Sequence, residues 1–288
     1  MGICDGRTII VTGAGGGLGR AYALALAEAG ANVVVNDIRA EAAAAVAHEI
    51  GARALDDHGD ITSMEGAAGI VRDAVQHFGD VHGVVNNAGV VRDRMFASMS
   101  EEEWDTVMKV HLRGHFCLAR TLVGRWRDEV KAGKKVDARI VNTSSGAGLQ
   151  GSVGQGNYAA AKGGIASLTL VQAAELGRYG ITANALAPAA RTGMTEKVFA
   201  DMMKKPDGGF DHYDPANVAP LVVWLCSALS AGVTGKVFEV EGGKISVADG
   251  WRTGKIADKK ARWKAEELTD VVTRLVGEAP KAQKVYGT

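Results

Sequence analysis

The chain has 288 residues, of which 47% carry hydrophobic side chains, and its 33 lysine and arginine residues balance 33 aspartate and glutamate residues. This length and composition are typical of a soluble, enzyme-sized globular chain with one large α/β domain rather than two. A net charge near zero gives no general electrostatic reason to bind nucleic acid or an anionic membrane. We therefore expect neither as a partner.

In chain order, short runs rich in valine, isoleucine and threonine alternate with longer alanine-rich segments of helical period, a pattern that predicts β-α units around a parallel sheet. The predicted strands are Thr8 to Thr12, Asn32 to Asn36, Arg53 to Asp56, Val81 to Asn86, Arg139 to Thr143, Thr182 to Leu186 and Val237 to Val240. The predicted helices are Leu18 to Ala29, Ala40 to Ile50, Met64 to Phe78, Glu101 to Lys131, Asn157 to Tyr179 and Pro215 to Leu229. Because the strands are almost continuously apolar, we expect a doubly wound, Rossmann-type parallel sheet of about seven strands with helices on both faces.

The composition changes after Gly250, where nine basic and five acidic residues follow and one more helix is predicted near Glu266 to Val276. We expect a dinucleotide-binding catalytic domain over residues 1–249 and a charged C-terminal extension over residues 250–288. The extra helix is expected to face solvent or to cover a contact in an oligomer, and binding of phosphate is the alternative.

Three features bear on the location of the chain and on metals. Cys4, Cys117 and Cys226 lack metal-type spacing, and their odd number fits reduced thiols better than a disulfide framework, so we expect no metal. The N-terminus does not have the pattern of a signal peptide. The uncharged stretch from Pro215 to Gly235 contains two prolines and several polar residues, which argue against a membrane span. The sequence therefore predicts a cytoplasmic protein.

A glycine-rich turn follows the first predicted strand, where Gly13, Gly17 and Gly19 have the spacing Gly-x-x-x-Gly-x-Gly and Leu18 begins the next helix. Glycines let the backbone approach a pyrophosphate group, and the helix N-terminus stabilises its charge. The turn is a weak signal alone, but the absence of a Gly-Lys-Ser/Thr sequence argues against a nucleoside triphosphate loop. A dinucleotide is therefore the favoured ligand.

Asp37 lies eighteen residues beyond Gly19, at the end of the second predicted strand. There its carboxylate can accept hydrogen bonds from the adenosine ribose and repel a 2′-phosphate, which favours NAD over NADP. Arg39 lies nearby and weakens this preference. The alternative is that Asp37 only caps the following helix.

Two more groups follow the third and fourth predicted strands, at the sheet edge where open parallel sheets bind ligands. They are Asp60 with Ile61, and Asn86, Asn87, Ala88 and Gly89. Either group could be an ordinary turn. Together they favour contact with the adenine and support of the central part of the cofactor.

Tyr158 and Lys162 are four residues apart on a predicted helix and therefore project from one face. The pKa of tyrosine is ordinarily about 10, so bringing it near 7 needs roughly 4 kcal/mol, much of which Lys162 is placed to supply. An exposed pair on a helix is the alternative. Ser145 ends the fifth strand at the same sheet edge, where its hydroxyl can hold a substrate oxygen while Tyr158 transfers a proton. Ser144 is its rival.

Through TGAGGGLG, NNAG, YAAAK and a serine thirteen residues before the tyrosine, the chain resembles the short-chain dehydrogenase/reductase family over roughly residues 5 to 245. The resemblance implies that Tyr158 is the general acid/base, that Lys162 lowers its pKa and binds the nicotinamide ribose, and that Ser145 orients the substrate oxygen. His111 stands where the family has a catalytic asparagine. Its ring either holds the water of a proton relay or is only structural.

A narrower resemblance concerns the substrate. The segments NNAGVVRDRMF, EEEWDTVMKVHLRGHF and GQGNYAAAKGGI are similar to the D-3-hydroxyacyl-CoA dehydrogenase part of peroxisomal multifunctional enzyme type 2 and its stand-alone bacterial relatives. This implies an NAD-dependent oxidoreductase that converts a 3-hydroxyacyl-CoA to a 3-oxoacyl-CoA. Its partners are then a small-molecule substrate, an acyl-CoA or a steroid, and further copies of the chain in a homodimer or homotetramer.

The segment after the sixth strand also matches the family. Pro188 and Thr192 correspond to its cofactor-contacting loop. The segment from Arg191 to Phe210 resembles a lid over the substrate, with a disordered linker as the alternative. Met202, Met203 and Phe210 in this segment suit a flexible acyl or sterol surface.

Other functions stay open at this stage. Within enzymes, they are a 17β-hydroxysteroid dehydrogenase and a 3-oxoacyl-carrier-protein reductase that uses NADPH. Outside enzymes, the alternative is a non-catalytic NAD-binding sensor, against which the intact Ser145, Tyr158 and Lys162 argue.

Overall fold

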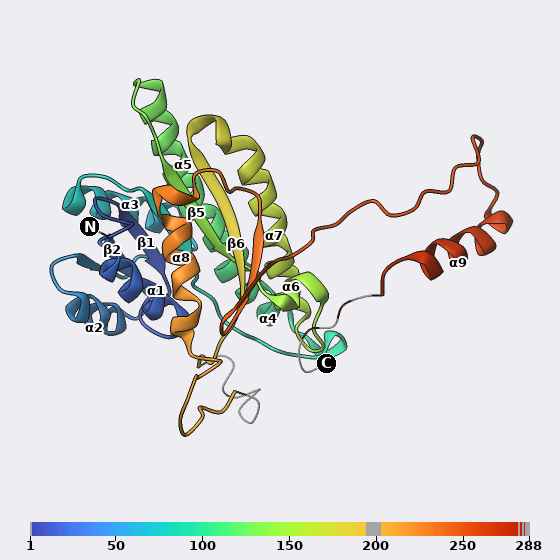
Figure 1. Ribbon diagram of the computed structural model, residues 1–288, viewed down its shortest axis with the longest axis horizontal. Helices are drawn as coiled ribbons and strands as arrows, with labels where there is room; N and C mark the ends of the chain where they lie inside the picture. The colour runs from blue at the N-terminus through green and yellow to red at the C-terminus, as the bar shows by residue number, and fades with distance from the viewer. Residues whose placement is uncertain (1, 194–202, 282, 284, 286–288) are drawn as a thin grey trace.

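The computed structural model describes residues 2–193, 203–281, 283 and 285. They form one eight-stranded sheet with helices on both faces (Figure 1), which confirms the predicted α/β architecture. The strands are β1 (Thr8–Thr12), β2 (Asn32–Asn36), β3 (Ala54–Asp57), β4 (Gly83–Asn86), β5 (Ala138–Thr143), β6 (Ile181–Ala189), β7 (Val237–Glu241) and β8 (Lys244–Val247). Their order is β3-β2-β1-β4-β5-β6-β7-β8, and β8 alone among them pairs antiparallel.

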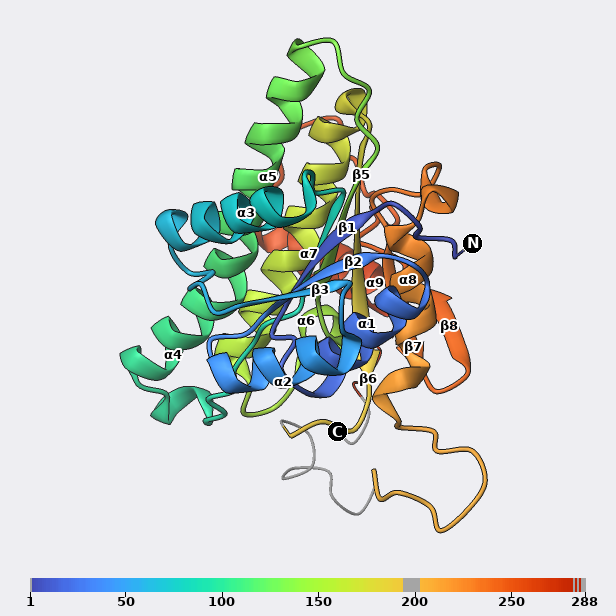
Figure 2. The ribbon, with the colours of Figure 1, turned by 90° about the vertical axis from the view of Figure 1, so that its left-hand side faces the viewer.

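Most of the described α-helices lie on the two faces of the sheet, and the last one stands clear of it (Figure 1). They are α1 (Gly17–Glu28), α2 (Ala40–Ile50), α3 (Met64–Phe78), α4 (Glu101–Met108), α5 (Gly114–Lys131), α6 (Gly146–Gln150), α7 (Gly156–Leu176), α8 (Ala219–Cys226) and α9 (Leu268–Glu278). Because side chains alternate along a strand, Ile9 and Val11 pack with residues of α1 and α8, whereas Ile10 packs with residues of α3 and α5. This alternation builds one core on each face of the sheet, beneath the helices that Figure 2 shows around it.

Two elements differ from the sequence prediction. The single helix predicted over Glu101 to Lys131 is two helices, α4 and α5, joined by a π-helical turn at Lys109–Arg113. The eighth strand, β8, was not predicted, because all four of its residues are exposed and it lacks the buried apolar run that marked the other strands. It adds an antiparallel edge to an otherwise parallel sheet.

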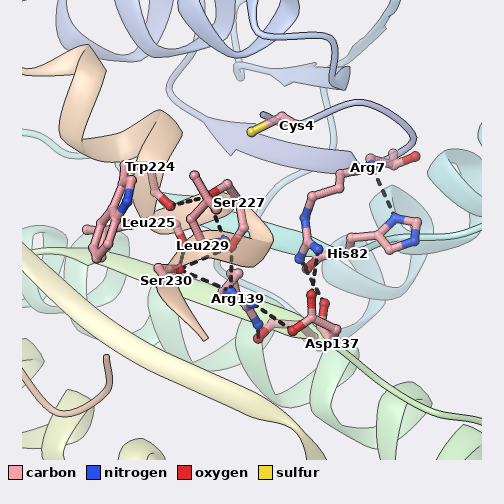
Figure 3. A network of polar contacts seen from close by, with 12 residues as sticks. Cys4, Arg7, His82, Asp137, Arg139, Trp224, Leu225, Ser227, Leu229 and Ser230 are labelled. Carbon is pink, nitrogen blue, oxygen red and sulfur yellow. Dashed lines mark hydrogen bonds and ion pairs between the residues drawn. The ribbon is translucent and has the colours of Figure 1, made fainter. Parts of the chain in front are cut away.

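A network of polar side chains lies at the amino ends of β1 and β5 (Figure 3). The Asp137 carboxylate pairs with Arg7 at 2.7 Å and with Arg139 at 2.6 Å, and the Arg139 side chain is only 1% exposed. Arg139 Nε also donates to the carbonyl oxygen of Ser227 at 3.0 Å and to Ser230 Oγ at 3.2 Å. The network joins the two strands to the short 3₁₀ helix Ala228–Ser230 that follows α8, at the sheet edge opposite the sequence motifs.

After β8 the chain leaves the body in an extended run, and α9 stands clear of the sheet (Figure 1). None of the α9 residues is buried. The division into a catalytic domain over residues 1–249 and an extension over residues 250–288 stays a prediction.

Candidate active site

The glycine-rich turn connects β1 to α1 and leaves no room for a side chain at Gly13, Gly15 and Gly19. Gly13 and Gly17 have φ values of +62° and +52°, which glycine adopts most easily. A Cβ on Gly19 would lie 2.1 Å from the carbonyl oxygen of Gly13. No side chain caps the N-terminus of α1 at Gly16, and the first turn holds no acidic residue. The backbone N–H groups and the positive end of the helix dipole therefore suit the pyrophosphate of a dinucleotide.

Asp37 follows β2 directly and is buried beside this turn. Its carboxylate accepts a hydrogen bond from the Gly15 amide at 3.0 Å and pairs with Arg39 Nε at 3.1 Å. Burial alone would raise the pKa of Asp37, but the hydrogen bonds from Arg39 and Gly15 outweigh it and leave the pKa below its ordinary value. Asp37 is thus a fixed negative charge at the edge of the turn.

Asn87, Ala88 and Gly89 follow β4 and bind the end of β1. The Thr12 hydroxyl accepts hydrogen bonds from the amides of Asn87 at 2.9 Å and Ala88 at 3.0 Å, while Asn87 Nδ2 donates to the Thr12 carbonyl oxygen at 3.0 Å. A Cβ on Gly89 would lie 2.3 Å from His111 Cε1, so glycine lets the imidazole approach the chain. The turn after β4 therefore lies between the glycine-rich turn and His111.

Asp60 and Ile61 lie after β3, but their side chains have structural partners. Asp60 accepts hydrogen bonds from the amide and the hydroxyl of Thr62 at 2.8 and 2.9 Å. Ile61 is buried against α5, where a Cβ on Gly114 would lie 2.8 Å from Ile61 Cδ1. Contact of these residues with an adenine stays a prediction.

Lys162 is the buried charge of the site. It lies in α7 with a relative exposure of 2%, and its Nζ donates to the Thr143 carbonyl oxygen at 2.7 Å. Burial lowers the pKa of Lys162 from 10.5 to about 7, because a charged ammonium loses its water there. The same Nζ lies 5.5 Å from the centre of the Tyr158 ring, so the predicted pair is brought together.

Ser144 and Ser145 have different environments. The Ser144 hydroxyl donates to the carbonyl oxygen of Lys162 at 2.8 Å and is buried. Ser145 Oγ accepts a hydrogen bond from the Ala147 amide at 3.2 Å at the start of α6, and its own proton is free to rotate toward another acceptor. The geometry thus gives Ser144 a structural partner and supports Ser145 as the serine that meets a substrate.

His111 lies in the π-helical turn and packs on Tyr158. The ring centroids are 5.2 Å apart in an edge-to-face arrangement, and His111 Nε2 lies 2.7 Å from the Val90 carbonyl oxygen. Burial, helped by the charge of Lys162, lowers the pKa of His111 to about 3. The imidazole is therefore neutral at pH 7. His115, one turn later, is also buried, and its Nε2 lies 3.3 Å from the Thr143 amide nitrogen.

The segment after β6 is described in part. Pro188 lies within β6, and a Cβ on Gly17 would lie 3.5 Å from the Thr192 methyl group, so Thr192 is beside the glycine-rich turn. Met203 is buried, whereas Phe210 is exposed. Residues 194–202 of the predicted lid lie outside the described residues, and Met194 and Met202 are among them.

Three residues of the site carry contacts that the motifs did not reveal. The Thr12 hydroxyl accepts a hydrogen bond from the turn after β4. The Thr143 carbonyl oxygen accepts one from the Lys162 ammonium. Asn157, just before Tyr158, is fully buried and bonds two distant backbone carbonyls. The asparagine beside the tyrosine was visible in the sequence, but the partners that give it a role were not.

Comparison with known proteins gives the family. Residues 7–203 match the family model described as short chain dehydrogenase, which is more than half of the chain. The chain is a short-chain dehydrogenase. It is therefore an oxidoreductase with a nicotinamide cofactor, and the predictions of an enzyme and of its family are confirmed.

Relatives of this short-chain dehydrogenase are known in bacteria and animals. It is 46% identical to hydroxyacyl-CoA dehydrogenase ChsB1 of Mycobacterium tuberculosis over 92% of this chain and 87% of the relative. It is 42% identical to mouse (Mus musculus) peroxisomal multifunctional enzyme type 2 over 89% of this chain but only 34% of that longer protein. A crystal structure of a short chain dehydrogenase from Mycobacterium avium covers the whole of both chains with 56% identity and a TM-score of 0.91.

Two further observations concern membrane-spanning helices and metal-binding clusters. Within the described ranges, none of the helices combines the length and the apolar character needed to cross a bilayer. Among the same residues, no cluster of three or more His, Cys, Asp or Glu side chains could hold a metal ion.

Proposed function

We propose that this short-chain dehydrogenase oxidises the 3-hydroxyl group of a 3-hydroxyacyl-CoA to a ketone with NAD. Bound NAD supplies the acceptor for the hydride that leaves carbon 3 of the substrate. Tyr158, as phenolate, takes the hydroxyl proton, and Ser145 holds the hydroxyl oxygen in place. The observation that carries the proposal is the pairing of Tyr158 with a buried Lys162, whose Nζ lies 5.5 Å from the ring.

Lys162 acts through its charge. When protonated, it favours the phenolate form of Tyr158, because an opposite charge nearby stabilises an anion in a buried site. Its burial makes this interaction stronger than it would be in water. The family resemblance also assigns to Lys162 the binding of the nicotinamide ribose.

His111 has a defined part in the proposed proton relay. Because its pKa is about 3, it does not change charge during turnover near neutral pH. A relay through His111 therefore uses the neutral ring, with one nitrogen as donor and the other as acceptor. The edge-to-face contact with Tyr158 places that ring beside the proton-transferring group.

The choice of NAD rests on Asp37. A fixed carboxylate at the end of β2 accepts hydrogen bonds from ribose hydroxyls and repels a 2′-phosphate. Arg39 is mostly exposed and could contact such a phosphate, but here it pairs with Asp37. Gly13, Gly17, Leu18 and Gly19 would hold the pyrophosphate, Pro188 and Thr192 would close over it, and Asn87 to Gly89 would support its centre.

The substrate class is supported by the relatives. The Mycobacterium tuberculosis relative is named a hydroxyacyl-CoA dehydrogenase, and the match spans nearly the full length of both chains. The test is a screen for NADH formation with 3-hydroxyacyl-CoA thioesters and with 17β-hydroxysteroids. Turnover of the steroids alone would refute the proposed substrate, and faster turnover with NADP than with NAD would refute the proposed cofactor.

The mechanism has its own test. Tyr158→Phe removes the phenolate oxygen that accepts the hydroxyl proton and is expected to lower kcat by about a hundredfold or more. Tyr179→Phe is the matched control, because Tyr179 lies in a 3₁₀ turn after α7 and contacts Arg127 and Arg178 instead of the site. Wild-type turnover in Tyr158→Phe would contradict the mechanism.

We also propose that the enzyme is a cytoplasmic homodimer or homotetramer. Large apolar side chains are half exposed on α5 and α7, namely Phe116, Leu170 and Val171. Contact between copies would remove them from water. Sedimentation measures the number of copies, and a monomer at micromolar concentration would refute the assembly. Cell fractionation tests the location, which the three buried, unpaired cysteines support.

A further inference from the structure

A buried chain of polar side chains crosses from the sheet to α7. Asn86 Nδ2 in β4 donates to Asn142 Oδ1 in β5 at 3.0 Å. Asn142 Nδ2 donates to Thr169 Oγ1 at 2.9 Å and to Gln172 Oε1 at 2.8 Å, and both acceptors belong to α7. All four side chains are buried. Because Asn142 uses both donor hydrogens on α7, the orientation of its amide and the position of the helix depend on each other.

The next two residues of β5 also bond α7. The Thr143 carbonyl oxygen accepts a hydrogen bond from Lys162 Nζ at 2.7 Å. The Ser144 hydroxyl donates to the Lys162 carbonyl oxygen at 2.8 Å. Figure 1 shows α7 lying beside β5 and β6. Three consecutive residues at the end of one strand therefore hold one helix. We call Asn142, Thr169 and Gln172 the polar anchor.

Apolar packing defines the position of this part of α7 only weakly. Between Tyr158 and Ile165 the helix consists of alanine and glycine residues and Lys162. A Cβ on Gly148 would lie 2.6 Å from the Gly163 amide nitrogen, so the backbones of α6 and α7 almost touch. Large side chains that interdigitate fix how one helix packs on its neighbour, and small residues resist sliding or rotation much less. Hydrogen bonds need a defined distance and direction, so the polar anchor supplies this restraint.

The polar anchor shares a face of α7 with the catalytic pair. Lys162 follows Tyr158 by four residues, and Thr169 follows Lys162 by seven. At about 100° for each residue, the three side chains project within about 40° of one another. A rotation of α7 that carries Thr169 away from Asn142 therefore turns Tyr158 and Lys162 by the same angle.

We propose that Asn142 is a positioning residue for the reaction. Through Thr169 and Gln172 it fixes the register of α7 on β5, and so it holds Tyr158 and Lys162 at the carboxyl edge of the sheet. This inference rests on the proposed function, in which Tyr158 as phenolate takes the hydroxyl proton. Asn142 acts through the helix and not through contact with the reacting atoms.

The expected consequence is electrostatic. Lys162 of the same helix and His111 of the π-helical turn face the Tyr158 ring. His111 is neutral at pH 7, so the positive charge that favours the phenolate is that of Lys162. If α7 is held less firmly, the mean distance between this charge and the phenolate grows, and their attraction weakens. A higher pH is then needed to form the phenolate.

The test removes both acceptors on α7 by combining Thr169→Val with Gln172→Met. These changes keep similar side-chain volumes and leave the bond between Asn86 and Asn142 in place. Oxidation needs the phenolate, so kcat rises with pH. We expect the midpoint of this rise to move up by about one pH unit and kcat at pH 7 to fall about tenfold. The KM for NAD should stay within about twofold, because the turn after β4 is unchanged.

Asn184→Leu is the matched control. Asn184 is also buried and lies in the neighbouring strand β6, but its Nδ2 donates to the Val233 carbonyl oxygen at 2.8 Å and its Oδ1 accepts the Lys236 amide at 3.1 Å. Both the double variant and Asn184→Leu should unfold at lower urea concentration, whereas only the double variant should move the pH midpoint. Thr169→Ser keeps the accepting hydroxyl and should keep the wild-type profile.

A second measurement needs no substrate. Ultraviolet absorbance reports phenolate, and subtracting the titration of Tyr158→Phe isolates the signal of Tyr158. Phenolate should form at higher pH in the double variant than in the wild type. Should the double variant not fold, Gln172→Met alone removes one acceptor and should shift both titrations in the same direction.

Each outcome decides the question. If the anchor variants lose stability but keep the wild-type titrations, Asn142 is only structural and the inference is wrong. An equal shift in Asn184→Leu would also overturn it. If the wild type oxidised none of the 3-hydroxyacyl thioesters, the proposed function would fail, while the phenolate titration would still decide whether the polar anchor positions Tyr158.

Discussion

Replacing Lys162 by methionine should make the protein more stable as well as less active. The ammonium is buried, and burial lowers its pKa from 10.5 to about 7. This displacement corresponds to about 5 kcal/mol that disfavours the charged form in the folded state. The hydrogen bond to the Thr143 carbonyl oxygen offsets about 2 kcal/mol of that when the lysine is charged. Methionine has similar length and no charge, so we expect Lys162→Met to raise the free energy of unfolding at pH 7 by about 3 kcal/mol.

The pH dependence of the stability difference distinguishes removal of the buried charge from better packing of the methionine. In the unfolded chain Lys162 keeps its proton up to about pH 10.4, whereas in the folded protein it loses the proton near pH 7. The unfolded state therefore binds more protons between these values, and wild-type stability rises with pH through that window. The advantage of Lys162→Met should shrink by about 2 kcal/mol between pH 7 and pH 9. Urea unfolding of both proteins without cofactor measures the difference in their free energies of unfolding. A difference that does not change with pH would refute the reasoning.

Three further predictions concern other parts of the fold. Ser145→Ala should lower kcat at least about a hundredfold and Ser144→Ala less than about tenfold in steady-state assays, and equal losses would contradict the assignment of Ser145. Asp37→Ala should raise the ratio of kcat/KM for NADP to that for NAD by about tenfold or more, because the repelling charge is gone; an unchanged ratio would show that Asp37 does not select the cofactor. Asp137→Asn leaves Arg139 buried without its counter-charge and should cost about 3 kcal/mol in urea unfolding, the low end for a buried pair because the Asp137 side chain is 41% exposed. A cost below about 1 kcal/mol would mean that water compensates Arg139.

The sheet and its order of helices could be predicted because burial on both faces leaves long apolar runs in the sequence. Thr8–Thr12 and Asn32–Asn36 were predicted with the bounds that the structure has, as were the helices at Ala40–Ile50 and Met64–Phe78. β8 could not be predicted in this way, since it is held by backbone bonds to β7 and buries none of its side chains.

The candidate site likewise contains residues that the sequence could predict and residues that it could not. Gly13, Asp37 and Lys162 could be proposed from the sequence because cofactor and proton chemistry restrict residue type and spacing within short motifs. The roles of Thr143 and Asn157 depend on partners far away in the chain: Asn157 bonds Arg92 and Glu103, which precede it by 65 and 54 residues. The sequence favoured Ser145 over Ser144, and the structure adds that the Ser144 hydroxyl bonds the carbonyl oxygen of Lys162 in α7.

The π-helical turn at Lys109–Arg113 restricts how the length of this chain can change. Each residue of an α-helix turns the chain by about 100°, and a π-helical turn arises where one extra residue is accommodated without breaking the helix. Deleting one residue from this turn would rotate α5 relative to α4 and carry His111 away from the Tyr158 ring. An insertion would rotate it in the opposite sense. We therefore expect natural variation in length to occur in surface loops and beyond β8, while the stretch from α4 to α5 keeps its residue count.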